Sequence, residues 1–204
     1  MARGRRALAC WTGPVSETFR VLHVCTGNLC RSPLAERLMR AGLAERLGAQ
    51  ASSFEVVSAG TLGEDGDPMQ PHGVRVLSGR GLDGTDFRAR RLVREQLAEA
   101  DLVLTATREH RVAAAALLPE VVGRTFTLRE SARLAALVDP GSLPPAPVAR
   151  AHALVAALAR SRRPPARPGD DDLTDPYRGP LRGFTACAAT IEDALRVPLD
   201  LLVP

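Results

Sequence analysis

The chain has 204 residues, which is about the length of one domain with a single hydrophobic core. Its net charge is +4 and all 27 basic residues are arginine, so phosphate loops, Schiff bases and kinase sites that need lysine are excluded. Aromatic residues make up 3%, too few for base-stacking platforms, and we expect no nucleic-acid partner.

The chain begins with a stretch, residues 1–19, that carries arginines but no apolar segment long enough for a signal peptide. We expect it to be a disordered N-terminal extension. No run of 18 apolar residues follows, so we expect no membrane segment. The four cysteines, Cys10, Cys25, Cys30 and Cys187, are too few and too unevenly spaced for a secreted disulfide framework. We therefore expect a cytoplasmic protein.

From residue 20 onward, short apolar runs typical of buried strands alternate with helical patterns. Strands are expected at residues 20–25, 54–60, 101–107 and 123–128, and helices at residues 33–48, 71–82, 90–100, 108–119 and 131–138. This alternation predicts an α/β fold: a single domain with a four-stranded parallel sheet and helices on both faces.

A segment rich in proline, alanine and arginine, residues 139–172, interrupts the alternation. Its two proline-rich stretches predict mobile loops, and residues 148–161 between them predict a helix. We interpret the segment as an insertion in a domain that spans residues 20–204. The last apolar pattern, residues 180–202, predicts an amphipathic helix that docks on the sheet.

The most informative stretch is HVCTGNLCRSPLAE, in which Cys25 ends the first strand and Arg31 and Ser32 open a helix. A cysteine and an arginine at this spacing are expected by chance in so arginine-rich a chain, but their position at the carboxyl end of a parallel strand is typical of a ligand site. Loop and helix amides there converge on an anion, and Gly27 and Asn28 tolerate the positive φ that a tight loop needs.

The chemistry of this loop points to a phosphate-like oxyanion. Arg31 can donate two parallel hydrogen bonds to two phosphoryl oxygens. The same positive field favours the thiolate of Cys25, and Ser32 is able to donate to that thiolate. The sequence thus predicts Cys25 as a nucleophile.

The segment CTGNLCRSP resembles the phosphate loop of the low-molecular-weight protein tyrosine phosphatases, in which C-x5-R-S follows the first strand. The stretches VVSAGT, FRARRL, ADLVLTATREH and DPYRGP resemble further landmarks of that family in the same order, over residues 20–137 and 173–203. The resemblance implies a phosphate loop after the first strand. It also implies that the protein hydrolyses phosphotyrosine in a protein partner through a phosphocysteine intermediate, with no metal or other cofactor.

The resemblance also implies roles for single residues. Cys25 attacks phosphorus, and Arg31 with the loop amides holds the phosphoryl oxygens. Asp175 protonates the leaving phenolate and later deprotonates the attacking water. The implied substrate-binding residues are Thr26, Gly27, Asn28, Leu29, Cys30, Ser32 and Tyr177.

Supporting roles follow from the same resemblance. Asn28 and Ser58 hold the loop by hydrogen bonds, and Tyr177 forms an aromatic wall beside the substrate. Cys30 is either structural or a partner that captures the oxidised nucleophile as a disulfide.

Three departures from the family stand out. Phe87 occupies a place where family members often carry histidine, so part of the supporting hydrogen-bond network is missing or replaced. The loop TLGEDGDP lacks an aromatic residue, so one wall of the substrate slot is bare. Residues 139–172 run directly into Asp175, which predicts a long and mobile general-acid loop.

Plainer interpretations compete at each position. Cys25 alone is more often an inert buried thiol, and a zinc site of His23, Cys25 and Cys30 lacks a second ligand cluster. Asp67 and Asp139 also precede a proline, but only at Asp175 does a tyrosine, Tyr177, follow that proline. Residues 170–172 are expected to be solvated loop charge.

Three other functions stay open beside the tyrosine phosphatase. A protein-arginine phosphatase is less favoured because Leu29 stands where such enzymes have a threonine. An arsenate reductase coupled to thioredoxin needs mid-chain cysteines, although a route through a small thiol stays open. A non-catalytic phosphoprotein-binding module would tolerate the loss of Cys25 or Asp175, and both are present.

Overall fold

The computed structural model describes residues 18–167 and 169–203. At its centre is a sheet of four parallel strands in the order β2-β1-β3-β4. The strands are β1 (Phe19–Cys25), β2 (Phe54–Gly60), β3 (Leu102–Thr105) and β4 (Thr125–Thr127). The prediction of a four-stranded parallel α/β fold is therefore confirmed.

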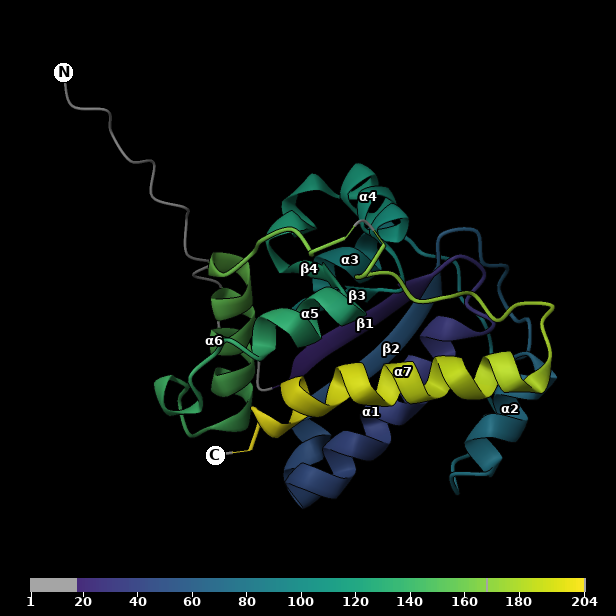
Figure 1. The fold of residues 1–204 in the computed structure, drawn as a ribbon, viewed down its shortest axis with the longest axis horizontal. Coiled ribbons are helices and arrows are strands. Elements are labelled where there is room, and N and C mark those ends of the chain that lie inside the picture. The colour runs from purple at the N-terminus through teal and green to yellow at the C-terminus, as the bar shows by residue number, and fades with distance from the viewer. Residues whose placement is uncertain (1–17, 168, 204) are drawn as a thin grey trace.

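Seven α-helices in the described residues surround this sheet (Figure 1). They are α1 (Arg31–Leu47), α2 (Pro71–Ser78), α3 (Arg94–Glu99), α4 (Arg108–Leu117), α5 (Leu128–Ala135), α6 (Pro147–Arg160) and α7 (Leu181–Asp200), and three short 3-10 helices, η1 (Gly48–Ser53), η2 (Pro119–Arg124) and η3 (Pro140–Ser142), join them. Helices α1 and α7 run along one face of the sheet, while α3 and α4 cover the other face.

The two faces follow from the alternation of side chains along β1. Phe19 and Val21 pack into the larger apolar cluster, with α1, α5, α6 and α7. Leu22 and Val24 point the other way, into a smaller cluster with α3 and α4. All residues of β1 except Arg20 are buried, so both sides of the strand face the interior, as is typical of a central strand in a parallel sheet.

Some helix boundaries differ from the predictions because backbone or capping hydrogen bonds change where a helix begins. Residues 90–92, predicted as the start of a helix, are extended instead, because Gly60 N donates to Arg90 O (2.8 Å) and Leu92 N to Gly60 O (2.8 Å). Helix α5 begins three residues earlier than predicted, because Thr127 and Glu130 form a capping box at its start.

The predicted N-terminal extension lies mostly outside the described residues, which begin at Thr18. Its last residue, Phe19, is an exception, since it opens β1 and is buried in the core. The prediction that residues 1–19 lie outside the domain is therefore wrong at Phe19, because the ring packs near Phe54 with 5.8 Å between centroids.

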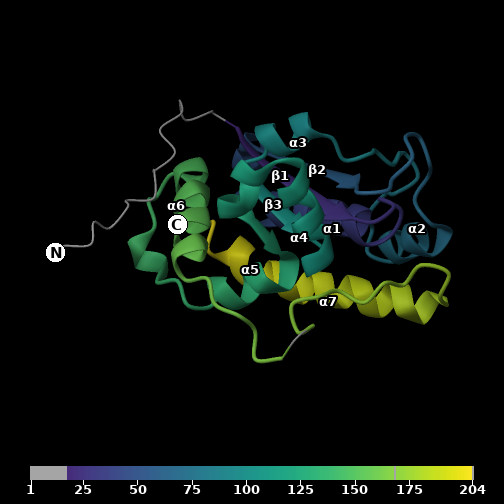
Figure 2. The ribbon, with the colours of Figure 1, turned by 90° about the horizontal axis from the view of Figure 1, so that it is seen from above.

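Helix α6 lies at one end of the sheet beside α5 (Figure 2) and matches the helix predicted at residues 148–161. Its buried Arg150 organises the proline-rich stretch before it. The guanidinium donates to Leu143 O (3.1 Å), Pro144 O (3.0 Å) and Pro140 O (3.2 Å), and also to Leu201 O near the end of α7. The first proline stretch is thus held by a buried side chain, where a mobile loop was expected.

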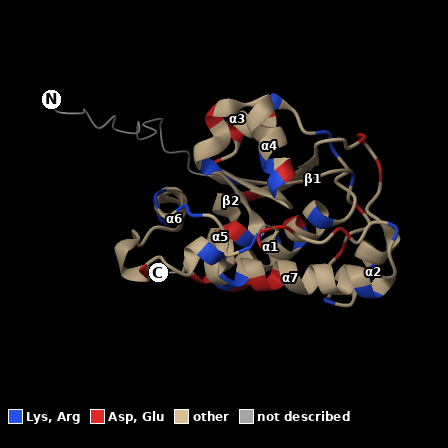
Figure 3. Ribbon diagram, turned by 45° about the horizontal axis from the view of Figure 1, so that its top comes forward, with Lys and Arg blue, Asp and Glu red and all other residues tan. Residues whose placement is uncertain are grey.

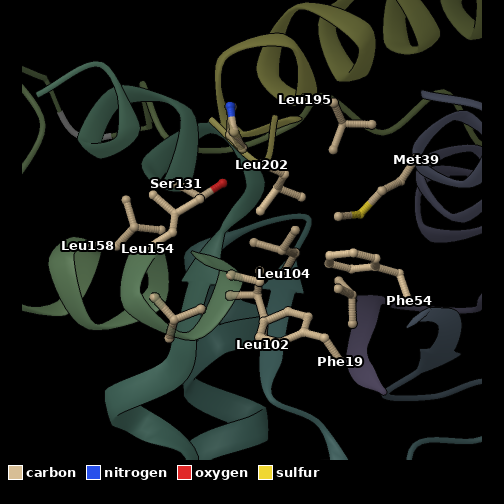
Figure 4. Close-up of a pocket in the computed structure, with 14 residues that line it drawn as sticks. Phe19, Met39, Phe54, Leu102, Leu104, Ser131, Leu154, Leu158, Leu195 and Leu202 are labelled. Atoms are coloured by element: carbon tan, nitrogen blue, oxygen red, sulfur yellow. The ribbon is translucent and has the colours of Figure 1, made fainter. Parts of the chain in front are cut away.

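A cavity of about 30 Å³ lies where β1 and β3 meet α5, α6 and α7 (Figure 4). Its labelled side chains are apolar except Ser131, whose hydroxyl donates to Leu128 O (2.7 Å). With no free polar group to orient a ligand, the cavity is a packing gap in the core.

Charged residues of both signs are interspersed over the helices and loops (Figure 3). Several arginines meet acidic partners across elements, such as Arg46 with Asp200 (2.8 Å) and Arg80 with Glu192 (2.7 Å). Among the described residues, no helix is long and apolar enough to cross a membrane.

Candidate active site

The loop between β1 and α1, Thr26–Cys30, lies at the carboxyl edge of the sheet. From β1 the chain proceeds to β2 on one side and afterwards to β3 on the other, so the loop occupies the topological switch point. Gly60 at the end of β2 supports it from below. A Cβ at Gly60 would lie 2.6 Å from Thr26 O and 2.8 Å from Asn28 N, so only glycine permits this approach.

Asn28 holds the loop from inside. Its backbone is left-handed, with φ of 55°, and its side chain is completely buried. The amide nitrogen donates to Ser32 Oγ and Ser58 Oγ, both at 2.9 Å, and the amide oxygen accepts from Arg90 N at 2.8 Å. These bonds explain why a residue with a short amide side chain stands at a strained position.

Cys25 lies buried at the base of the loop, with Sγ 3.0 Å from Ser32 Oγ. Because Ser32 Oγ accepts from Asn28, the Ser32 proton is available to donate to Cys25 Sγ. Ser32 is the second residue of α1, so the sulfur also faces the positive end of that helix. A sulfur with a hydroxyl neighbour and a helix N-terminus beside it is in the position of a nucleophile.

Arg31 brings the two distant parts of the site together. Its Nη2 donates to Thr26 Oγ1 (3.1 Å) and to Asp175 Oδ2 (2.6 Å), 144 residues along the chain. Its Nε is buried without a hydrogen-bond partner among the described residues. An oxyanion bound by the loop amides would accept a hydrogen bond from this unpaired guanidinium donor.

A buried carboxylate, Glu36 on α1, supports the loop from behind. It accepts from Ser58 Oγ (2.6 Å) and pairs with Arg40 (3.0 Å) and Arg90 (3.7 Å). Phe87, at the place where family members often carry histidine, is buried, and the guanidinium of Arg37 lies 5.9 Å from its ring centroid. Ser58, Arg40 and Arg90 are the partners of Glu36.

Replacing Glu36 by alanine is expected to lower the free energy of unfolding by about 2 kcal/mol, because Ser58, Arg40 and Arg90 lose their anionic partner. Both arginines are partly exposed, so the loss is smaller than for a fully buried ion pair. Urea denaturation measures this. Glu45→Ala on the same helix, where the side chain is 80% exposed, is the control and should change stability by less than about 0.5 kcal/mol. Equal stability of the two variants would contradict the role given to Glu36.

Two supporting residues went unrecognised in the sequence, Glu36 and His110. Glu36 follows Ser32 by four residues, so it faces the loop from the buried side of α1, and a charge in an apolar stripe is the signal. His110 Nε2 lies 2.9 Å from Thr26 Oγ1, and Nδ1 lies 2.7 Å from Thr107 Oγ1. Burial and then the charge of Arg31 lower the pKa of His110 to about 4, so the ring is neutral above that pH.

The other predicted site residues surround this centre. Leu29 is half-buried and, with residues 67–71 and Val74, lines an open groove of about 530 Å³. Cys30 is a buried free thiol, and burial raises its pKa to about 12. Tyr177 is 44% exposed, and its backbone N donates to Asp175 Oδ1 (3.2 Å).

The segment that leads to Asp175 is more firmly held than the sequence predicted. Asp171 and Asp172 were expected to be solvated, but Asp171 is buried against Arg133 (2.8 Å) and Asp172 pairs with Arg108 (3.3 Å). Of the three aspartates that precede a proline, Asp175 contacts Arg31, whereas Asp139 caps the turn of η3 by accepting from Gly141 N.

The zinc hypothesis finds no support in the described part of the chain, where no three potential ligands gather. His23 Nε2 instead lies 3.2 Å from Met39 Sδ, and burial lowers the pKa of this histidine to about 3.

Comparison with known proteins agrees with this geometry. A family model described as low molecular weight phosphotyrosine protein phosphatase matches residues 20–140. A low molecular weight protein-tyrosine-phosphatase of Streptomyces coelicolor is 32% identical over 178 residues, 87% of this chain and 89% of that protein. A protein-arginine-phosphatase of Geobacillus stearothermophilus is 34% identical over 112 residues, 55% of this chain and 70% of that protein.

Among solved structures, a low molecular weight protein tyrosine phosphatase from T. tengcongensis is similar over 90% of this chain and 99% of its own, with 29% identity and a TM-score of 0.66. Sequence, fold and the phosphate loop after β1 agree, and the chain belongs to the low molecular weight phosphotyrosine protein phosphatase family.

Proposed function

We propose that this protein hydrolyses phosphotyrosine in a protein partner through a phosphocysteine intermediate. The observation that carries the proposal is the contact between Arg31 and Asp175, which brings a proton donor to the anion-binding guanidinium of the loop that follows Cys25. In the first step Cys25 Sγ bonds to phosphorus, the bond from phosphorus to the phenolic oxygen breaks, and Asp175 gives its proton to that oxygen.

The second step returns the enzyme to its starting state. Asp175 takes a proton from a water molecule, and the water oxygen bonds to phosphorus. The bond between sulfur and phosphorus breaks, so that phosphate leaves and the Cys25 thiolate is restored. Arg31 and the loop amides hold the equatorial oxygens in both steps.

A binding step precedes the first chemical step. The incoming dianion and the Asp175 carboxylate compete for the same donor, Arg31 Nη2. Substrate binding therefore displaces Asp175 from the guanidinium. We expect the displaced side chain to remain beside the phosphate loop, where in its protonated form it acts as the general acid.

The choice of tyrosine over arginine rests on Leu29. Its apolar side chain packs against the core cluster at the edge of the loop and offers a surface for a phenyl ring. It has no hydroxyl to receive a guanidinium. Protein-arginine phosphatase is the second candidate, because a relative with that name has an identity similar to that of the tyrosine phosphatase relative.

A pair of peptide substrates tests the choice. The wild type should hydrolyse a phosphotyrosine peptide with a kcat/KM at least about 100-fold higher than that for a phosphoarginine peptide, and Leu29→Thr should lower the phosphotyrosine value about 10-fold. Val112→Thr, at an exposed valine of α4, is the matched control. Faster release of phosphate from phosphoarginine by the wild type would assign the second function.

The cellular compartment is part of the same proposal. We place the enzyme in the cytoplasm, where phosphorylated proteins and reducing conditions occur together. The three described cysteines are all free thiols, which fits a reducing compartment.

A further inference from the structure

We propose that Arg133 and Arg108 are positioning residues for the general acid, because their ion pairs with Asp171 and Asp172 fix the segment that carries Asp175. The inference rests on the proposed function, in which Asp175 protonates the leaving group. Both arginines lie outside the phosphate loop, Arg108 in α4 and Arg133 in α5.

The first anchor joins the segment to α5 and β4. Arg133 donates to both carboxylate oxygens of Asp171, from Nε at 3.2 Å and from Nη2 at 2.8 Å. Asp171 is 5% exposed at its side chain, and its backbone oxygen accepts from Thr127 Oγ1 at 2.6 Å. Two hydrogen bonds in one plane fix the orientation of the Asp171 carboxylate as well as its distance from Arg133, whereas a single hydrogen bond would leave the carboxylate free to rotate.

The second anchor joins the segment to the start of α4. Arg108 donates to Asp172 from its backbone N (2.8 Å) and from its guanidinium, with Nη2 3.3 Å from Oδ2. The next residue, Leu173, is buried, and its backbone N donates to Ala106 O at 2.8 Å. Residues 171 to 173 are therefore attached to β4 and α5 on one side and to residues 106–108, which join β3 to α4, on the other.

The short distance to Asp175 makes these anchors matter for catalysis. Two residues of extended chain span about 7 Å at most, so the anchored Leu173 confines where the Asp175 carboxylate can lie. Asp175 itself is 44% exposed at its side chain, which contacts Arg31 and accepts a hydrogen bond from the backbone N of Tyr177. When a dianion takes Arg31, the anchors keep Asp175 within reach of the leaving oxygen.

The test compares two leaving groups in Arg133→Met and Arg108→Met. A general acid matters most when the leaving phenolate is a strong base. Arg133→Met should therefore lower kcat for phenyl phosphate about 10-fold and kcat for 2,4-dinitrophenyl phosphate less than about 3-fold. Arg108→Met should show the same preference with a smaller loss, because the backbone N of residue 108 still donates to Asp172. Equal losses for both substrates, or no loss for either, would overturn the proposal.

Arg80→Met is the matched control. Arg80, in the turn after α2, makes a similar two-bonded ion pair with Glu192 of α7, at 2.7 and 2.9 Å. Its loss should leave the ratio of the two kcat values unchanged. Arg133→Lys, which keeps one hydrogen bond to Asp171, should recover part of the phenyl phosphate rate.

A double variant separates this inference from the proposed function. In an Asp175→Asn background, Arg133→Met should cause no further leaving-group-dependent loss. If Asp175→Asn alone lowers both substrates equally, the general-acid assignment fails. If Asp175→Asn behaves as expected but Arg133→Met and Arg108→Met do not, only the positioning role fails.

Discussion

Replacing Cys25 by serine is expected to lower the turnover of p-nitrophenyl phosphate by about 10⁴-fold or more, because a hydroxyl is a much weaker nucleophile than a cysteine sulfur. The two side chains are nearly equal in size, so the loop, with its Asn28 and Ser32 hydrogen bonds, should keep its shape. Turnover measured from pH 5 to 8 gives the result, and arsenate should inhibit the wild type competitively.

The control for this variant is Cys187→Ala. Cys187 is a buried cysteine of α7 whose pKa burial raises to about 12, so it is a packing thiol at neutral pH. The alanine variant should retain turnover close to that of the wild type. Turnover in Cys25→Ser above about 1% of wild type would remove the nucleophile assignment. Consumption of arsenate in the presence of a thiol, without phosphatase activity, would point to the reductase.

Replacing Asp175 by asparagine is expected to lower kcat for phenyl phosphate by about 10²- to 10³-fold, because the phenolate then leaves without a proton. The loss for 2,4-dinitrophenyl phosphate should be below about 10-fold, since that leaving group needs little protonation. Steady-state kinetics on the two esters measures both values. The dependence on leaving group identifies proton donation, which a general loss of structure would not imitate.

The same variant should bind oxyanions more tightly. In the wild type the carboxylate lies 2.6 Å from Arg31 Nη2 and competes with an incoming dianion for that donor. Because the carboxylate is partly exposed, the gain in phosphate or vanadate affinity should be modest, about 2- to 5-fold.

Asp139→Asn, at another aspartate that precedes proline, is the control and should change neither quantity. Weaker oxyanion binding in Asp175→Asn would contradict the competition between the two anions.

The local parts of this site could be predicted from the sequence because they depend on neighbouring residues. Cys25, Asn28, Arg31 and Ser32 lie within eight positions, and the strand, loop and helix that hold them follow from periodicity and turn chemistry. The sheet was predictable for the same reason, since strand and helix patterns alternate. Helix α6 was predicted from the helical spacing of its apolar residues, but the hydrogen bonds that hold the proline-rich stretch before it were not.

Partners far apart in the chain could not be predicted. The pairs Asp171 with Arg133 and Ser58 with Glu36 join segments whose contact depends on the finished packing. A run of three aspartates in a proline-rich segment is usually solvated, and only the fold brings arginines to two of them. His110 was overlooked for a similar reason, because its partner Thr26 lies 84 residues away.

The buried Arg150 has a consequence for the order in which the protein matures. Prolines lack a backbone N–H, so donors are scarce around residues 140–144, and this guanidinium donates to the carbonyls of Pro140, Leu143 and Pro144. Pro140 O also accepts from Leu143 N, and the guanidinium in turn donates to Leu201 O. That carbonyl leaves the ribosome 51 residues after Arg150. Segment 140–160 therefore acquires its final hydrogen bonds only after α7 has been synthesised and has docked, so its locking is a late event in the folding of the nascent chain.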